Sequence, residues 1–89
     1  MILIVTYELK QSADSYSDLF EALKAHDSWS HYIPSTWLIA TDSSPKELYQ
    51  KLVGHVFQGD RILIAQLVPG YYGLLPTKAW DWIKRYRDK

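Results

Sequence analysis

The sequence predicts an α+β fold in which helices cover a small antiparallel sheet. Two segments, residues 1–8 and 61–68, are apolar at nearly every position, as expected of strands covered on both faces. Two segments between them carry apolar residues at helical spacing. Residues 35–42 are rich in β-branched and aromatic side chains, which favours a further strand.

The first strand spans residues 1–8 and ends at the carboxylate of Glu8. Its two faces would present Met1, Leu3, Val5 and Tyr7 on one side and Ile2, Ile4 and Thr6 on the other. A strand with one face in water alternates apolar and polar side chains, and this segment hardly does. We therefore expect a central strand.

A first helix is predicted to begin near Asp14 or Ser15, after a loop at residues 9–13. Ser15 and Asp18 have the spacing of a capping box, with Asp in place of the usual Glu. The apolar stripe, at positions i, i+3, i+4 and i+7, consists of Tyr16, Leu19, Phe20 and Leu23.

Residues 28–34 predict a short strand or an extended arm, and Pro34 places this segment at an edge or a bend. Residues 35–42 predict the next strand. A second helix begins clearly, because Ser44 can cap it, Pro45 suits the first helical position and Glu47 completes a capping box. Its apolar stripe is predicted to comprise Leu48, Tyr49, Leu52, Val53 and Val56.

A turn at Gly59 and Asp60 precedes the last strand, residues 61–68, which Pro69 and Gly70 end. Residues 71–76 form an aromatic connector. A short helix follows over residues 77–86, with Thr77 as its expected cap. One side of that helix would present Ala79, Trp80, Ile83 and Arg87.

The resulting order, β-α-β-β-α-β plus a C-terminal helix, is the ferredoxin-like sandwich with an antiparallel sheet, formed by residues 1–89 as a single domain. Two helices can cover only one face of this sheet. The other face, also apolar in the first and last strands, needs either the C-terminal helix or a second copy. We expect a homodimer that buries it.

Charge and composition narrow the possible functions. The 89 residues have a formal net charge of zero, which argues against a dedicated, tight nucleic-acid binder but allows a local basic patch. Without cysteine, disulfides, thiolate metal sites and a cysteine nucleophile are excluded. The apolar first segment is too short for a signal peptide or a membrane span, so we expect a cytoplasmic protein with no membrane partner.

Three segments, taken in order, resemble a known family. They are residues 4–8 (IVTYE), 29–42 (WSHYIPSTWLIATD) and 60–67 (DRILIAQL). The chain resembles Cas2-like proteins, the small ferredoxin-fold dimers of CRISPR systems and their relatives. Its STW segment and its GLLPTKAWDWI tail are similar to uncharacterised bacterial proteins labelled SinR-like. The resemblance implies a ferredoxin-like fold, a symmetric dimer and a metal-dependent nuclease ancestry.

Glu8 is the position that this resemblance singles out. In Cas2 proteins the Asp that follows the strand's Tyr is the proposed metal ligand at the dimer interface, and Glu8 follows Tyr7 here. The resemblance implies that two Glu8 carboxylates could share Mg²⁺ or Mn²⁺ and activate water for phosphodiester attack. Glu places its carboxylate one methylene further out than Asp. The alternative is a strand-end carboxylate in solvent or paired with a lysine.

Basic and aromatic side chains could contact nucleic acid. Phosphate contacts could come from Lys78, Lys84, Arg85 and Arg87. Bases could stack on Trp29, Tyr32, Trp37, Tyr71, Tyr72, Trp80 and Trp82. The commoner use of such aromatic residues is packing in the core and at a dimer interface.

Other polar groups are weaker candidates. His26, Asp27 and His31 could bind a metal, although their spacing fits no standard site, and His55 is similarly placed near a helix end. A cation or phosphate could bind Asp42, Ser43 and Ser44, which more simply initiate a helix. Ser35 and Thr36 lack an evident base for nucleophilic catalysis.

Three hypotheses of function follow. The leading one is a Cas2-like dimer with a nucleic-acid-related role, either metal-dependent endoribonuclease activity or binding of RNA or DNA. The second is a non-catalytic homodimeric interaction module, for example in a toxin–antitoxin or phage-defence setting. The third is a small-ligand sensor that uses the dimer cavity. Of the three, only the first includes an enzyme, so the sequence leaves both an enzymatic and a non-enzymatic role open.

Overall fold

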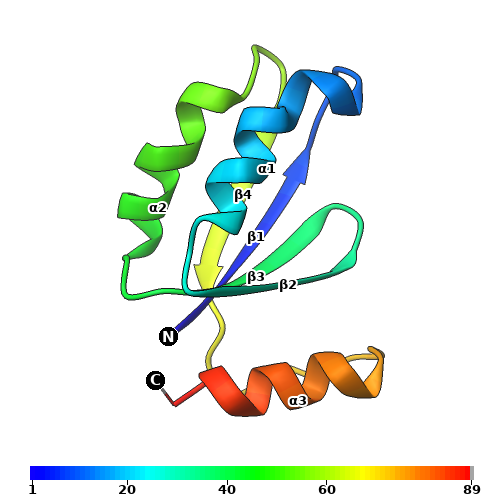
Figure 1. Cartoon of the computed structure of the whole chain (residues 1–89), viewed down its shortest axis with the longest axis vertical. Coiled ribbons are helices and arrows are strands. Elements are labelled where there is room, and N and C mark those ends of the chain that lie inside the picture. Colours follow the sequence, from blue (N-terminus) through cyan, green and yellow to red (C-terminus); the bar gives the residue numbers. More distant parts are fainter. Residues whose placement is uncertain (89) are drawn as a thin grey trace.

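The computed structural model describes residues 1–88 and has an α+β architecture with one four-stranded antiparallel sheet (Figure 1). The strands are β1 (Ile2–Glu8), β2 (Ser28–Ile33), β3 (Thr36–Ala40) and β4 (Arg61–Gln66). The helices are α1 (Ser17–Lys24), α2 (Pro45–Leu52) and α3 (Thr77–Tyr86), with 3-10 turns η1 (Ala13–Tyr16) and η2 (Val53–His55). The sheet order is β2-β3-β1-β4.

β1 is a central strand, as its apolar sequence predicts, because it pairs with β3 on one side and β4 on the other. The register places Leu3 opposite Ile39 and Val5 opposite Trp37. These side chains point to the face covered by α1 and α2. The core on that face consists of Leu3, Val5, Tyr16, Leu19, Leu23, Trp37, Ile39, Leu48 and Leu52.

The apolar stripe of α1 is confirmed, since Tyr16, Leu19 and Leu23 are buried and Phe20 packs against them. The predicted capping box is wrong. The chain enters the helix through η1, where the Ser15 N–H donates to the Ser12 carbonyl at 3.0 Å. Tyr16 therefore becomes the N-cap of α1, without a side-chain capping bond.

The predicted start of α2 is confirmed. The Glu47 N–H donates to Ser44 Oγ at 3.1 Å, and the Ser44 N–H donates to Glu47 Oε1 at 3.0 Å, so the capping box is complete. The predicted stripe is too wide, because only Leu48 and Leu52 are fully buried. Tyr49 and Val53 are exposed, since each lies about 100° around the helix from its buried neighbour.

β2 and β4 are the edges of the sheet. The edge position predicted for residues 28–34 is confirmed, because the chain turns at Pro34 and Ser35 after β2 ends. Within residues 1–88 the last strand is covered on one face only, and the second copy expected to cover its other face stays a prediction. β4 ends at Gln66, and Leu63 on the face opposite α1 and α2 is 66% exposed because nothing in residues 1–88 covers it.

α3 spans the predicted residues and lies across the second face of the sheet (Figure 1). Its buried residues Ala79 and Ile83 share that side with Ile2, which is 1% exposed. The helix itself begins at Thr77, so its N-cap is Pro76 rather than Thr77, and no side chain makes a capping bond there. The C-terminal helix thus covers part of this second face, which we expected a second copy of the chain to cover.

None of the helices in residues 1–88 has the length and apolar character needed to cross a membrane.

Candidate functional site

Glu8 ends β1 beside two basic residues. Its Oε1 lies 3.2 Å from Lys10 Nζ, and its partner in the antiparallel register is Arg61 on β4. The side chains of Glu8 and Lys10 are 60% and 54% exposed. This geometry agrees with the interpretation of Glu8 as a strand-end carboxylate paired with a lysine. A single chain offers only this one carboxylate at the position that the resemblance singles out.

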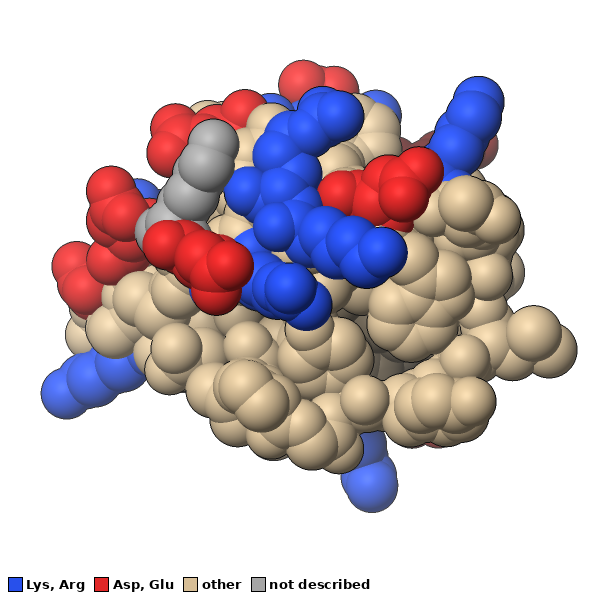
Figure 2. Space-filling model, turned by 90° about the horizontal axis from the view of Figure 1, so that it is seen from below, with Lys and Arg blue, Asp and Glu red and all other residues tan. Residues whose placement is uncertain are grey.

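The four basic residues predicted to contact phosphates all lie exposed on α3 or directly after it. Figure 2 shows Lys and Arg side chains gathered on this side of the molecule, with Asp and Glu side chains beside them. Arg87 Nε lies 3.7 Å from Asp88 Oδ2, and both side chains are at least half exposed. Such an exposed ion pair is weak, so Arg87 can exchange it for a phosphate.

Glu8 and the basic side of α3 are not brought together. The molecule measures 35 Å along its longest axis, and the tip of β1 lies toward one end of that axis while α3 lies at the other (Figure 1). A phosphodiester held by α3 is therefore not delivered to Glu8 of the same chain. Within one chain, the predicted catalytic residue and the predicted phosphate-binding residues therefore lie at two separate sites.

The predicted aromatic set also divides in two. Trp37 is 2% exposed and belongs to the core, where its ring stacks on His31 at 3.9 Å and its Nε1–H donates to Tyr7 Oη at 2.9 Å. Burial raises the pKa of Tyr7, and the bond from Trp37 partly opposes that rise. Trp37 is thus unavailable for stacking on a base.

The connector between β4 and α3 presents the most exposed large side chains. Tyr72 is 100% exposed and Leu74 is 98% exposed. The preceding Tyr71 and the Arg87 side chain line one shallow depression, so the connector runs beside the basic end of α3. An exposed aromatic ring next to cations is the combination that proteins use to bind single-stranded nucleic acid.

The histidines do not form the predicted metal site. His31 Nε2 lies 3.0 Å from the Pro34 carbonyl, and its ring stacks on Trp37. His26 instead lies in a polar depression with Asp27 and Lys51, where burial and the Lys51 charge lower its pKa and Asp27 acts to raise it. Within residues 1–88, no three His, Asp or Glu side chains are close enough to hold a metal together.

The two remaining serine-containing groups have structural partners. Ser44 caps α2, as the simpler interpretation predicted, while the Ser43 N–H donates to Thr41 Oγ1 at 3.1 Å. Thr36 Oγ1 donates to Thr6 Oγ1 at 3.2 Å across the two central strands. That threonine pair contains no base, so it offers no activated nucleophile.

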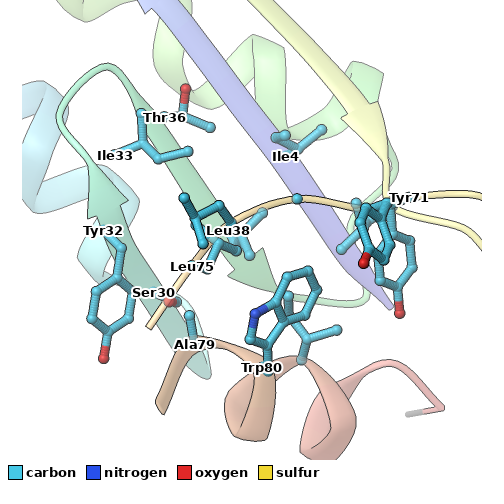
Figure 3. A pocket seen from close by; sticks show the side chains of 15 residues that line it. Ile4, Ser30, Tyr32, Ile33, Thr36, Leu38, Tyr71, Leu75, Ala79 and Trp80 are labelled. Atoms are coloured by element: carbon cyan, nitrogen blue, oxygen red, sulfur yellow. The ribbon is translucent and has the colours of Figure 1, made fainter. Parts of the chain in front are cut away.

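A cavity of about 230 Å³ lies between the second face of the sheet and α3 (Figure 3). Its lining is mostly apolar and includes Leu38 from β3 and Trp80 from α3. Ser30 also lines it and is only 6% exposed, yet its hydroxyl makes no hydrogen bond with any residue from 1 to 88. Sequence reasoning missed Ser30. The signal was the position of Ser28 and Ser30 on one face of a strand whose other face presents Trp29.

Asp60 is a second residue that sequence reasoning undervalued. The predicted turn is confirmed, and Gly59 adopts a φ of 93° there. The Asp60 carboxylate also accepts the Tyr16 hydroxyl at 2.7 Å and the N–H groups of Lys10 and Phe57, each at 2.8 Å. Burial acts to raise the pKa of Asp60, but these hydrogen bonds and the Lys10 charge outweigh it and lower the pKa. Asp60 therefore ties three segments together.

Comparison with family models, curated proteins and solved structures yields no significant match to this chain.

Proposed function

We propose that this chain is a Cas2-like module with a nucleic-acid-related role, in which α3 and the connector before it bind single-stranded RNA or DNA. The observation that carries the proposal is the row of exposed cations on α3 and directly after it, Lys78, Lys84, Arg85 and Arg87, next to the connector that presents the fully exposed Tyr72. Two aspartates, Asp81 and Asp88, offset only part of this charge. A chain with zero net charge thus concentrates positive charge where an aromatic ring is free to stack.

We propose further that the fold is ferredoxin-like. In support, each helix of the two β-α-β units lies on the same face, and the two units interlock. β3 lies between β1 and β2, and β1 lies between β3 and β4. This arrangement leaves one sheet face for α3 and for any partner.

Binding is favoured over cleavage by the surroundings of Glu8. The 3.2 Å ion pair with Lys10 competes with any cation for this carboxylate, and α3 lies far from it. The nuclease activity that the resemblance implies would need two copies, each offering Glu8 to a shared Mg²⁺ or Mn²⁺. Octahedral Mg²⁺ demands close to ideal geometry from its ligands.

Binding is tested with fluorescently labelled single-stranded RNA and DNA over a range of salt concentrations. The logarithm of affinity should fall linearly with the logarithm of salt concentration, by about 0.7 per phosphate contact. The double variant Lys84→Gln/Arg85→Gln should reduce that slope by about 1.4. Lys46→Gln on α2 is the matched control and should leave it unchanged. Binding without salt dependence, or no binding, would refute the proposal.

Cleavage is tested separately with the same oligonucleotides, with Mg²⁺ or Mn²⁺ and with Glu8→Ala beside the unchanged protein. We expect retained binding and no metal-dependent cleavage. Cleavage that disappears in Glu8→Ala would instead assign a catalytic role to this carboxylate. Cleavage that persists in the variant would remove Glu8 from the mechanism.

A second candidate function is the non-catalytic homodimeric interaction module. It is favoured by exposed apolar residues on both edge strands of the sheet: Leu63 on β4 is 66% exposed, and Ile33 on β2, which also lines the cavity beside α3, is 47% exposed. Exposed apolar residues grouped on one face commonly mark an interaction surface. A second copy that covers them would bury that surface, and the dimer could still carry α3 on its outside.

A further inference from the structure

The cavity beneath α3 has the size of a binding site for a small molecule. Its volume is about 230 Å³. A dry apolar cavity of roughly 150 Å³ is enough to bind benzene. The cavity here therefore has room for a molecule somewhat larger than one aromatic ring, such as two fused rings.

The lining determines the chemistry of the occupant. Figure 3 shows Trp80 rising from α3 toward the sheet, with Leu38 and Ile4 on the strands above it. Among the described residues that line the cavity there is no Asp, Glu, Lys or Arg. A charged ligand would lose its hydration there without gaining a counter-ion, so the occupant is uncharged.

One buried polar group in the lining has no hydrogen-bond partner among residues 1–88. Ser30 lies on β2 and is 94% buried, since its exposed fraction is 6%. Its hydroxyl makes no hydrogen bond with any described residue. Every side-chain oxygen or nitrogen in residues 1–88 that is fully inaccessible has a partner. The Ser30 oxygen has none, so it must be accessible, and the space that it borders is the cavity. Buried hydroxyl groups normally have a partner, which a ligand would supply here.

We propose that this cavity binds a small, flat, uncharged molecule of one or two fused rings that carries a single hydroxyl or N–H group. The rings lie between Trp80 on α3 and Leu38 on β3. The polar group of the ligand exchanges a hydrogen bond with Ser30 Oγ. This site lies within one chain. Its lining includes Tyr71 and Tyr72 of the connector proposed to bind nucleic acid, but the contacts proposed for the ligand are made by residues of β2, β3 and α3.

The direct test is a titration of the full chain with 2-naphthol, followed by methyl NMR. Shifts should be confined to the methyl groups of Ile4, Leu38 and Ala79, which line the cavity. The methyl groups of Leu19 and Leu48, buried on the other face of the sheet, should not move. No shift at about 1 mM 2-naphthol, or shifts centred on the main core, would overturn the proposal.

Ser30→Ala isolates the hydrogen bond, because it removes the hydroxyl with little change of shape. It should weaken 2-naphthol binding about three- to tenfold, as expected for one hydrogen bond, and leave naphthalene binding unchanged. Ser35→Ala, at an exposed serine in the turn between β2 and β3, is the control and should alter neither. Equal binding of 2-naphthol to the unchanged protein and to Ser30→Ala would contradict the assigned contact.

A side chain from a second copy is the competing occupant. Repeating the titration at several protein concentrations, with light scattering on the same samples, distinguishes the two. The affinity for 2-naphthol should be independent of protein concentration. Affinity that falls as dimers form would show that the second copy fills the cavity, and the proposal would fail.

Discussion

The indole Nε1–H of Trp82 donates a 2.9 Å hydrogen bond to Ser28 Oγ, joining residues 54 positions apart in the chain. Trp82 lies on α3 and Ser28 begins β2. The connector before α3 has no helix or strand of its own, so few contacts decide where α3 lies. This bond, together with the burial of Ala79 and Ile83, holds the helix to the second face of the sheet.

Trp82→Phe should destabilise the protein by about 1 kcal/mol, because it removes this hydrogen bond but keeps an aromatic ring near Tyr86. Ser28→Ala should cost a similar amount. Since both changes remove the same bond, the double variant should cost less than the sum of the two. Urea denaturation of the four proteins measures this coupling, and strictly additive losses would contradict the bond.

Asp60 should make stability depend on pH in the acid range. The pKa of Asp60 is lowered in the folded state, so its ionised form is favoured by folding. This contribution is fully present above the ordinary carboxyl pKa of about 3.9 and is lost as pH falls through the lower folded value. Asp60→Asn, which cannot ionise, should lack it.

Thermal unfolding of the unchanged protein and of Asp60→Asn between pH 7 and pH 2 checks this sign. The difference in midpoint temperature should be constant from pH 7 to about pH 5 and should shrink below about pH 4. Asp14→Asn, at an exposed residue whose side chain makes no ion pair or hydrogen bond with residues 1–88, is the control. A difference that persists unchanged to pH 2 would mean that the charge of Asp60 is not involved.

Two serines at predicted helix starts should behave differently. Ser44→Ala should cost about 1 kcal/mol, because Ser44 Oγ accepts the Glu47 N–H in a complete capping box. Ser15→Ala should change stability by less than about 0.5 kcal/mol, because Ser15 lies within η1 and caps nothing. Chemical denaturation of both variants tests the correction, and equal losses would restore the capping role predicted for Ser15.

Leu63→Lys tests the proposed homodimer. A charge at this exposed position on the open face should leave the fold intact and abolish dimers. Tyr49→Lys, at an exposed residue on α2, is the matched control and should have no effect on assembly. Light scattering at micromolar concentration measures the mass. If the unchanged protein and both variants are monomers, the proposed homodimer is refuted. If Leu63→Lys is still a dimer, the interface does not include Leu63.

Sequence patterns were most reliable where one short segment determines the outcome. The capping box of α2 and the range of α3 follow from local hydrogen bonds and helical periodicity, and both are confirmed. The stripe on α2 was predicted too wide, because Tyr49 and Val53 are as apolar as their neighbours. How much of an apolar stripe is buried depends on the surface opposite it, and periodicity does not contain that information.

The candidate sites were less predictable for the same reason. The four basic residues were predicted as a group, and the structure places three of them on α3 and Arg87 directly after it. The lysine partner of Glu8 is a near neighbour in the chain and was foreseen as the alternative, but the distance between Glu8 and α3 is set by the fold alone. Ser30 and Asp60 gain their importance from residues far away in sequence, which no local motif reveals.

The sequence by itself determined the alternation of strands and helices, the central position of β1 and the apolar character of both its faces. These depend on side-chain periodicity and on caps and turns, which act over a few residues. Only the tertiary structure decided that α3 covers the second face of β1 incompletely and leaves a cavity beneath it, with a buried Ser30 whose hydroxyl has no partner among residues 1–88. That outcome depends on how side chains far apart in the sequence fit together, as Trp82 and Ser28 do at a separation of 54 positions, and fit of this kind is a property of the packed molecule.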